Sequence, residues 1–152
     1  MYRNGRPVLP INDPLESLYL RYFADNFVDG QLQTAAIRFP NQSVNRGSLS
    51  EPEDVLFDEQ GRYDGLGVVE IMVHEIPETI ADANGTQFSF NVSHSPEEKN
   101  YSHSEIRSPP PLTGPSKVPS RTAKFKFRHA LCRCITSQRV RIVAMRESTQ
   151  HS

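Results

Sequence analysis

Two histidines and a glutamate carry the clearest candidate chemistry in this chain. His94, His103 and Glu105 lie in the stretch 86–106, TQFSFNVSHSPEEKNYSHSEI. Histidine titrates near neutral pH and can act as a general acid or base, so the three together would suit acid–base catalysis or metal binding, with His74 as a further member. The same residues would equally fit a solvated hairpin face, because their spacing matches no specific catalytic signature.

The stretch around these residues predicts a β-hairpin. Apolar and polar residues alternate over 88–92, which is the two-residue period of a strand, and 95–100 contains turn residues. The returning strand covers 101–106. We expect Ile106 to share the core face with Phe90, because the other register would bury an unpaired histidine and glutamate. The residues that would then face away from the core are Asn91, Ser93, Tyr101, His103 and Glu105.

A second candidate feature is the basic C-terminal region. Residues 1–116 carry 17 acidic and 8 basic residues, whereas residues 117–152 carry 9 basic residues and one acidic residue. This polarity indicates either that the basic segment packs on the acidic body or that it meets an anionic partner. No aromatic residue follows Phe127, so a nucleic-acid contact by the last strand would be to the backbone alone. The residues expected to bind the anion or partner are Lys124, Lys126, Arg128, Arg133, Arg139 and Arg141, with Arg146 beyond them.

Two amphipathic helices are predicted to position these residues. The first covers 14–28, with Asp13 as its cap, a proline at its first position, Glu16 in a capping-box arrangement and Gly30 after its end. The second covers 123–136, where apolar residues recur with helical spacing. The apolar stripes are Leu15, Leu18, Tyr19, Tyr22, Phe23 and Phe27 in the first helix, and Phe127, Ala130, Leu131, Cys134 and Ile135 in the second.

Strands are predicted on either side of these helices. The clearest is 67–76, GVVEIMVHEI, and others are expected at 32–39 and 140–143, with a short helix at 50–57. In the last strand Arg139 and Arg141 would share one face. The predicted fold is therefore α+β, a single small domain with a mostly antiparallel sheet that the two amphipathic helices cover.

The chain of 152 residues, 12 of them prolines, divides into regions by composition. The segment SPPPLTGPSKVPS favours extended backbone, so we expect a semi-rigid linker there, with a ligand for a proline-binding module as the alternative. The expected regions are an irregular N-terminal arm at 1–12, an acidic α+β body at 13–107, the Pro-rich linker at 108–120, a basic helix–strand element at 121–146 that completes the same domain, and a tail at 147–152.

Several classes of protein do not fit the composition. No run of about 18 apolar residues is present for a transmembrane helix, and the N-terminus has no signal-peptide core, so the expectation is a cytoplasmic protein without a membrane partner. Cys132 and Cys134 are too few for a zinc site and too close on a helix to bridge easily. We expect Cys134 to be a small core residue, and we expect neither a metal nor a cofactor.

Two classes of function fit these features. The first is a non-catalytic small binding protein, a subunit or adaptor of a larger protein assembly, which the missing catalytic motifs, the proline-rich segment and the polarised charge favour. The alternative is a small metal-independent ribonuclease or nucleic-acid-binding protein that uses the His/Glu cluster and the basic C-terminal surface. A protein partner is preferred over nucleic acid because the net charge of the whole chain is only −1.

Overall fold

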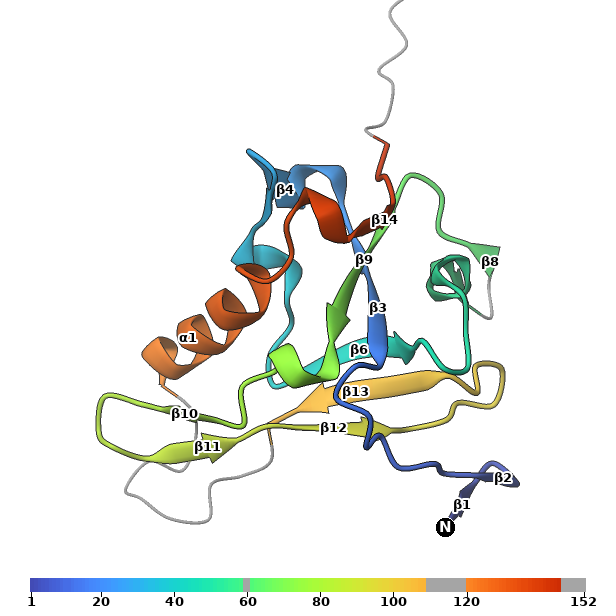
Figure 1. Cartoon of the computed structure of the whole chain (residues 1–152), viewed down its shortest axis with the longest axis horizontal. Coiled ribbons are helices and arrows are strands. Elements are labelled where there is room, and N and C mark those ends of the chain that lie inside the picture. The colour runs from blue at the N-terminus through green and yellow to red at the C-terminus, as the bar shows by residue number, and fades with distance from the viewer. Residues whose placement is uncertain (59–60, 109–119, 146–152) are drawn as a thin grey trace, which may run out of the picture.

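The fold is built on a six-stranded antiparallel sheet with strand order β12-β13-β6-β3-β9-β14. The structure, a computed structural model, describes residues 1–58, 61–108 and 120–145, with only the backbone at Asp58 (Figure 1). The strands of this sheet are β3 (Ser17–Tyr22), β6 (Asn41–Arg46), β9 (Gly67–Met72), β12 (Asn91–His94), β13 (His103–Arg107) and β14 (Val140–Ile142).

Short elements connect these strands. Four two-stranded sheets and five 3-10 turns occur within the described residues. The small sheets are β1 (Tyr2–Arg3) with β2 (Arg6–Pro7), β4 (Phe27–Val28) with β5 (Gln31–Leu32), β7 (Phe57–Asp58) with β8 (Gly61–Arg62), and β10 (Thr79–Ala81) with β11 (Gln87–Ser89). The turns are η1 (Ala24–Asn26), η2 (Thr34–Ala36), η3 (Pro52–Leu56), η4 (Val73–Glu75) and η5 (Ser137–Arg139).

The large sheet consists of two halves that meet at a short seam. Strands β12, β13 and β6 form one half, and β3, β9 and β14 form the other, so that the two halves cross in Figure 1. β3 pairs with β9 along its whole length, but it pairs with β6 only through Leu18 opposite Arg46 and Tyr19 opposite Asn45. The side chains at this seam therefore determine how the two halves are held together.

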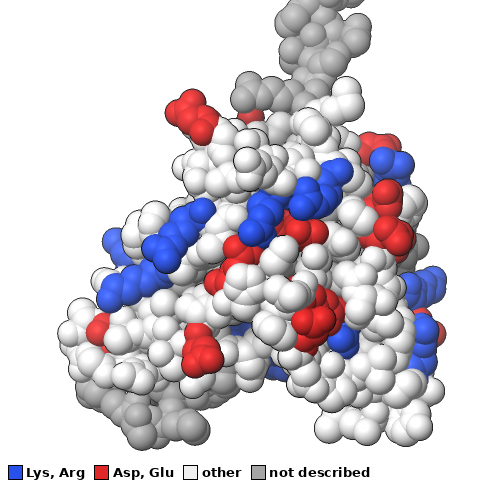
Figure 2. Space-filling view, in the orientation of Figure 1, with Lys and Arg blue, Asp and Glu red and all other residues white. Residues whose placement is uncertain are grey.

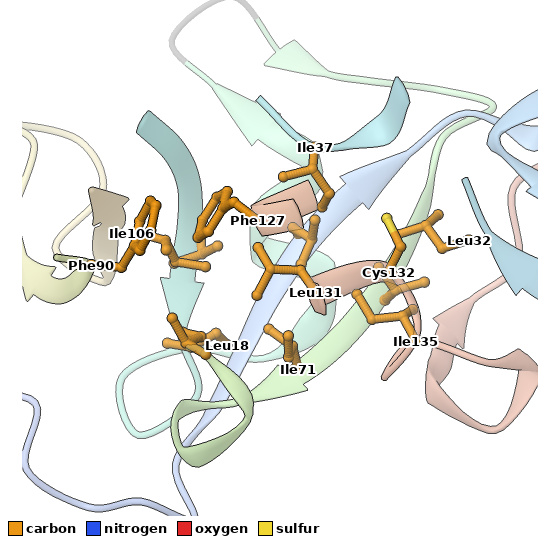
Figure 3. Packing of buried hydrophobic residues seen from close by; sticks show 14 of the residues in the cluster. Leu18, Leu32, Ile37, Ile71, Phe90, Ile106, Phe127, Leu131, Cys132 and Ile135 are labelled. Carbon is orange, nitrogen blue, oxygen red and sulfur yellow. The ribbon is translucent and has the colours of Figure 1, made fainter. Parts of the chain in front are cut away.

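Helix α1 (Arg121–Cys132) covers one face of the sheet. The side chain of Ser120 caps its first turn by accepting a hydrogen bond from the Ala123 amide at 3.2 Å. Figure 3 shows the buried side of α1 facing the sheet, and Phe127 stacks on Phe90 with ring centroids 4.1 Å apart. The second predicted helix is therefore present, although it begins at Arg121 and ends at Cys132.

The first predicted helix, 14–28, is wrong. This segment forms β3, η1 and β4, so the described part of the chain is mostly β with one α-helix, and the predicted α+β sheet covered by two helices is wrong. The helical stripe shares Leu18 and Tyr22 with a two-residue alternation, and Leu20 decides between them. Leu20 is 1% exposed, whereas Phe23 of the helical stripe is 64% exposed. The alternation prevails because β3 lies between β6 and β9 and hydrogen-bonds to both.

Two tight turns explain why the predicted helix end at Gly30 and the predicted irregular arm at 1–12 differ from the structure. Asp29 and Gly30 have φ of 52° and 76°, and Asn4 and Gly5 have φ of 56° and 73°. Asp-Gly and Asn-Gly pairs with positive φ at both positions form the two-residue loops of β-hairpins. Gly30 thus turns β4 into β5 instead of ending a helix, and the expected irregular arm contains the β1–β2 hairpin. The predicted strand at 32–39 is wrong, because only its first residue is in a strand and η2 follows.

The central hairpin is present, but only β12 and β13 form it, because Phe88 belongs to β11 of another sheet and Phe90 lies between β11 and β12. The predicted core face of this hairpin is confirmed. Val92 lies opposite Ile106, and both Phe90 and Ile106 are buried in the core, as the preferred register requires. The strand predicted at 67–76 exists as β9 followed by η4, and β14 lies where the final strand was expected. The linker residues 109–119 and the terminal residues 146–152 lie outside the described residues.

The two assignments of the N-terminal segment can be distinguished by stability. Leu20→Ala removes a fully buried side chain from β3, so we expect it to lower the free energy of unfolding by about 2–5 kcal/mol. Phe23→Ala removes an exposed ring and should change it by less than about 0.5 kcal/mol. Chemical denaturation of both variants measures the difference, and a helix at 14–28 would give the opposite order.

Candidate functional site

The three residues of the predicted catalytic cluster do not come together. His94 lies opposite Ser104 on the core face of the sheet and is 5% exposed. His103 and Glu105 alternate with Ser104 along β13, so their side chains lie on the other face. His74 is an exposed residue of η4, which follows β9 in the other half of the sheet.

His103 and Glu105 are partly buried on this face, with side chains 12% and 23% exposed. His103 Nδ1 lies 2.8 Å from the Ser95 carbonyl oxygen, and its Nε2 lies 3.9 Å from the Glu97 carboxylate. Glu105 forms an ion pair with Arg107 at 3.6 Å. Within the described ranges no group of three or more His, Cys, Asp or Glu side chains could hold a metal ion. A catalytic role for these residues stays a prediction.

His94 instead holds the N-terminal arm. Its Nδ1 accepts a hydrogen bond from the Leu9 amide at 2.9 Å, and its Nε2 lies 2.6 Å from the Tyr101 carbonyl oxygen. Accepting at one nitrogen and donating at the other requires the neutral ring. Burial, reinforced by the nearby Arg46 guanidinium, lowers the pKa of His94, although the Tyr101 carbonyl acts in the opposite direction. The histidine is therefore a structural link between the arm and the hairpin.

A buried ion pair lies at the seam of the sheet. Arg46 donates two hydrogen bonds to the Glu16 carboxylate, from Nε at 2.9 Å and from Nη2 at 2.8 Å, and both side chains are less than one-tenth exposed. Arg46 also donates to the Leu9 and Pro10 carbonyls, and Ser48 donates to Glu16 from its hydroxyl and amide. Burial alone would raise the pKa of Glu16, but the hydrogen bonds from Arg46 and Ser48 outweigh it and hold the pKa below its usual value.

An open cavity of about 450 Å³ lies over this ion pair. Its wall includes Asp13, Tyr19 and Ser48 besides the pair itself. Glu16 and Arg46 already bond each other, Ser48 and the arm, so the charged floor of the cavity serves the fold. No pattern in the sequence indicated this site, because the partners are 30 residues apart and Glu16 fitted the capping box of a predicted helix.

The six basic residues predicted to bind an anion divide into two groups. Arg139 forms two hydrogen bonds to Glu75, at 2.7 and 3.0 Å, and Arg141 pairs with Glu70 at 3.0 Å. These two arginines therefore pair with acidic residues of the same chain, which is the alternative to binding an anionic partner. Burial alone would raise the pKa of Glu75, but hydrogen bonds from Arg139 and the Met72 amide hold it below its usual value.

The other four predicted residues belong to α1 or directly follow it, and all but Arg128 are exposed. Residues 121–133 contain five cations and no acidic residue. Across residues 1–58, 61–108 and 120–145 no salt bridge joins any of these cations to a carboxylate within 4 Å. Arg128 is partly buried and the other four are exposed. We call this surface the α1 basic face, and it consists of Arg121, Lys124, Lys126, Arg128 and Arg133 together with Phe125 and His129 between them.

Figure 2 shows this surface directly. Lys and Arg side chains form a row over α1 that continues over η5 and β14, where acidic side chains lie beside them. The acidic neighbours at β14 include the partners described above, Glu75 and Glu70. The free positive charge is therefore concentrated on the helix.

Two exposed aromatic side chains, Phe125 and His129, lie on the outer side of the helix, and we call this pair the aromatic crest. The rings of Phe125 and His129 stack with centroids 5.6 Å apart and an interplanar angle of 11°. Phe125 is 56% exposed, on the side of α1 away from the buried Phe127. The sequence-based site omitted Phe125, His129 and Arg121, although residues 125 and 129 are four apart and outside the apolar stripe, which is a readable helical signal.

The two cysteines take no part in this surface. Both are free thiols, as expected from their spacing. Burial raises the pKa of Cys132 to about 12, so its thiol is unreactive at neutral pH. Cys132 is the more buried of the two, and Cys134 packs against the core from its edge.

Comparisons with known proteins give no function for this chain. No protein-family model, no curated protein and no solved structure matches the chain. Among the described residues no helix is long and apolar enough to cross a membrane.

Breaking the seam ion pair should be costly. Arg46→Met leaves Glu16 as a buried carboxylate without its partner, and we expect a loss of about 3–5 kcal/mol in the free energy of unfolding. Arg107→Met removes an exposed ion pair in the same sheet and should cost less than about 1 kcal/mol. Equal losses in urea denaturation would contradict a central role for the seam.

Acid should weaken the fold through His94. Its native pKa lies below the unfolded value of about 6.5, so its contribution is present above that pH and is lost as the pH falls toward the native pKa. Glu16 and Glu75 add a second loss at lower pH, below about 4.5. We expect His94→Gln to remove the loss just below pH 6.5, measured as melting temperature against pH, while exposed His129→Gln keeps it. An unchanged profile in His94→Gln would show that this ring does not titrate with folding.

Proposed function

We propose that this protein is a non-catalytic small binding protein, a subunit or adaptor of a larger assembly, and that the α1 basic face binds its anionic partner. One observation carries the proposal. Arg139 of η5 and Arg141 of β14 are paired with Glu75 and Glu70, whereas the cations of α1, four of them exposed and Arg128 partly buried, have no carboxylate partner among the described residues. Unneutralised charge of one sign on a rigid element attracts and orients an oppositely charged partner.

The rigidity of α1 supports this role. Ala123, Phe127, Leu131 and Cys132 are each at most 3% exposed, so the helix is anchored along its inner side. A rigid helix presents its outer side chains at a fixed spacing, and little entropy is lost there on binding. The cationic side chains themselves stay free to adapt.

The arrangement of the histidines supports a binding function over a ribonuclease. Acid–base cleavage of RNA by His94 and His103 would need both rings at one phosphate. They lie on opposite faces of β12 and β13, and both nitrogens of His94 are occupied. We therefore keep the ribonuclease as the outcome that would replace this proposal.

Charge reversal on the helix tests the proposed surface. In a pull-down, the full chain should bind its partners less strongly as the salt concentration rises. Lys124→Glu/Arg133→Glu should abolish this capture, because it reverses two exposed charges of the α1 basic face. The matched control is Arg62→Glu/Lys99→Glu, which changes charge by the same amount in β8 and in the β12–β13 turn, far from α1 in Figure 1. Capture lost equally in both variants would contradict the proposal.

A cleavage assay completes this test. Purified protein incubated with labelled RNA in EDTA should leave the RNA intact. Cleavage that disappears in His103→Ala would replace the binding function with the ribonuclease.

A further inference from the structure

We infer that the partner of the α1 basic face is a single-stranded nucleic acid, whose phosphates contact the helix cations while a base stacks on Phe125. This inference rests on the proposed function and specifies the partner of the same surface. It starts from the combination of an exposed, stacked aromatic pair and cations on both of its sides.

The positions along the helix place cations on both flanks of the crest. At 100° per residue, Arg121, Lys124 and Arg128 fall on one side of Phe125, and Lys126 and Arg133 fall on the other. Cations from 121 to 133 extend over about 18 Å of helix axis, at about 1.5 Å per residue. A nucleic-acid strand that lies along the helix would therefore meet positive charge over the whole length of its contact with α1.

Arg128 lies next to the aromatic crest and is partly buried. Its Nε is buried and makes no hydrogen bond to another described group, so this nitrogen is not accessible to a phosphate. The planar fork of arginine also carries two terminal nitrogens, and these are the donors that would give a phosphate charge-assisted hydrogen bonds. Lys126 differs, because its Nζ already donates to the Ala81 carbonyl at 3.3 Å.

The aromatic crest distinguishes nucleic acid from an acidic protein. Both partners would satisfy the cations, but an acidic peptide gains little from an aromatic face. Unpaired bases stack on exposed rings whatever their sequence, and proteins that bind single strands combine such rings with a basic surface. Phe125 is 56% exposed and already stacks on one side with His129, which leaves it fixed in position for a base.

The aromatic crest should also make single-stranded nucleic acid bind more tightly than a duplex. In a duplex the bases stack on one another, so Phe125 would have no free base to contact and only the phosphates would bind. The ring should therefore contribute to the binding of a single strand and not to that of a duplex. The expected complex is sequence-tolerant and sensitive to salt.

Binding to labelled polyanions tests this inference with the full chain. Fluorescence anisotropy is measured with single-stranded oligo-uridine, oligo-thymidine, a DNA duplex of mixed sequence and polyglutamate. Phe125→Leu keeps an apolar side chain but removes the ring, and it should weaken binding to both single strands about tenfold, the loss of one base stack, while leaving duplex binding unchanged. Phe57→Leu is the matched control, since Phe57 is 50% exposed in β7 and lies outside α1.

The charge contribution is measured in the same experiment. Lys124→Gln/Arg133→Gln should reduce the slope of log Kd against log salt by about 1.4, since each phosphate contact contributes about 0.7 for a single strand. Arg62→Gln/Lys99→Gln should leave that slope unchanged. Melting temperatures of all variants verify that they are folded.

The outcomes separate this inference from the proposed function. Wild-type affinity for single strands in Phe125→Leu, or tighter binding of polyglutamate than of any nucleic acid, overturns the inference and leaves a charge-dependent binding protein. Failure of every polyanion to bind, together with partner capture that survives Lys124→Glu/Arg133→Glu, overturns both.

Discussion

The ion pair between Glu16 and Arg46 is the contact on which the rest of the fold depends. The two halves of the sheet share only two residue pairs along the seam, and Arg46 is a member of one of them. From that position its guanidinium binds the residue before β3, the carbonyls of the N-terminal arm and, through Glu16, the loop that begins at Ser48. Residues 9–16 and residues 46–48, about 30 positions apart in the sequence, are thereby joined at one buried ion pair. Such a pair is costly to desolvate, and its full set of hydrogen bonds compensates that cost.

The distribution of charge along the chain explains why the proposed binding surface lies on α1. Acidic residues dominate the first part of the chain and basic residues the last, but the fold neutralises this difference only in part. β14 packs beside β9, which brings Arg141 to Glu70 and Arg139 of the preceding turn η5 to Glu75. α1 lies on the apolar face, where its inner side packs in the same core cluster as Phe90, Ile106 and Ile71. Its outer cations form no salt bridge with the described carboxylates.

The sequence predicted those elements in which one period was unambiguous. Apolar residues alternate at Val69 and Ile71 and again at Phe88, Phe90 and Val92, and the stripe from Phe127 to Leu131 has helical spacing alone. Strands and a helix are present at these positions, although the second run is interrupted at Phe90. In the N-terminal segment Leu18 and Tyr22 satisfy both periods, and only pairing with β6 and β9 selects the strand. The seam ion pair was beyond prediction for the same reason, since it exists only after distant strands pair. In the candidate site the cations were named from composition, but the division between paired and free cations required knowledge of which strand lies beside Glu70.

The position of β14 has one further consequence, for self-association. Among the described strands β14 lies at an edge of the large sheet, which is the position where another chain can pair with a sheet. It is three residues long, its register shifts between Val140 and Ile142, and Arg141 places a charge in its middle. Shortness, irregular register and an edge charge each discourage a second strand from adding to a sheet. The arginines that neutralise the acidic body thus also protect this end of the sheet from growing into an aggregate.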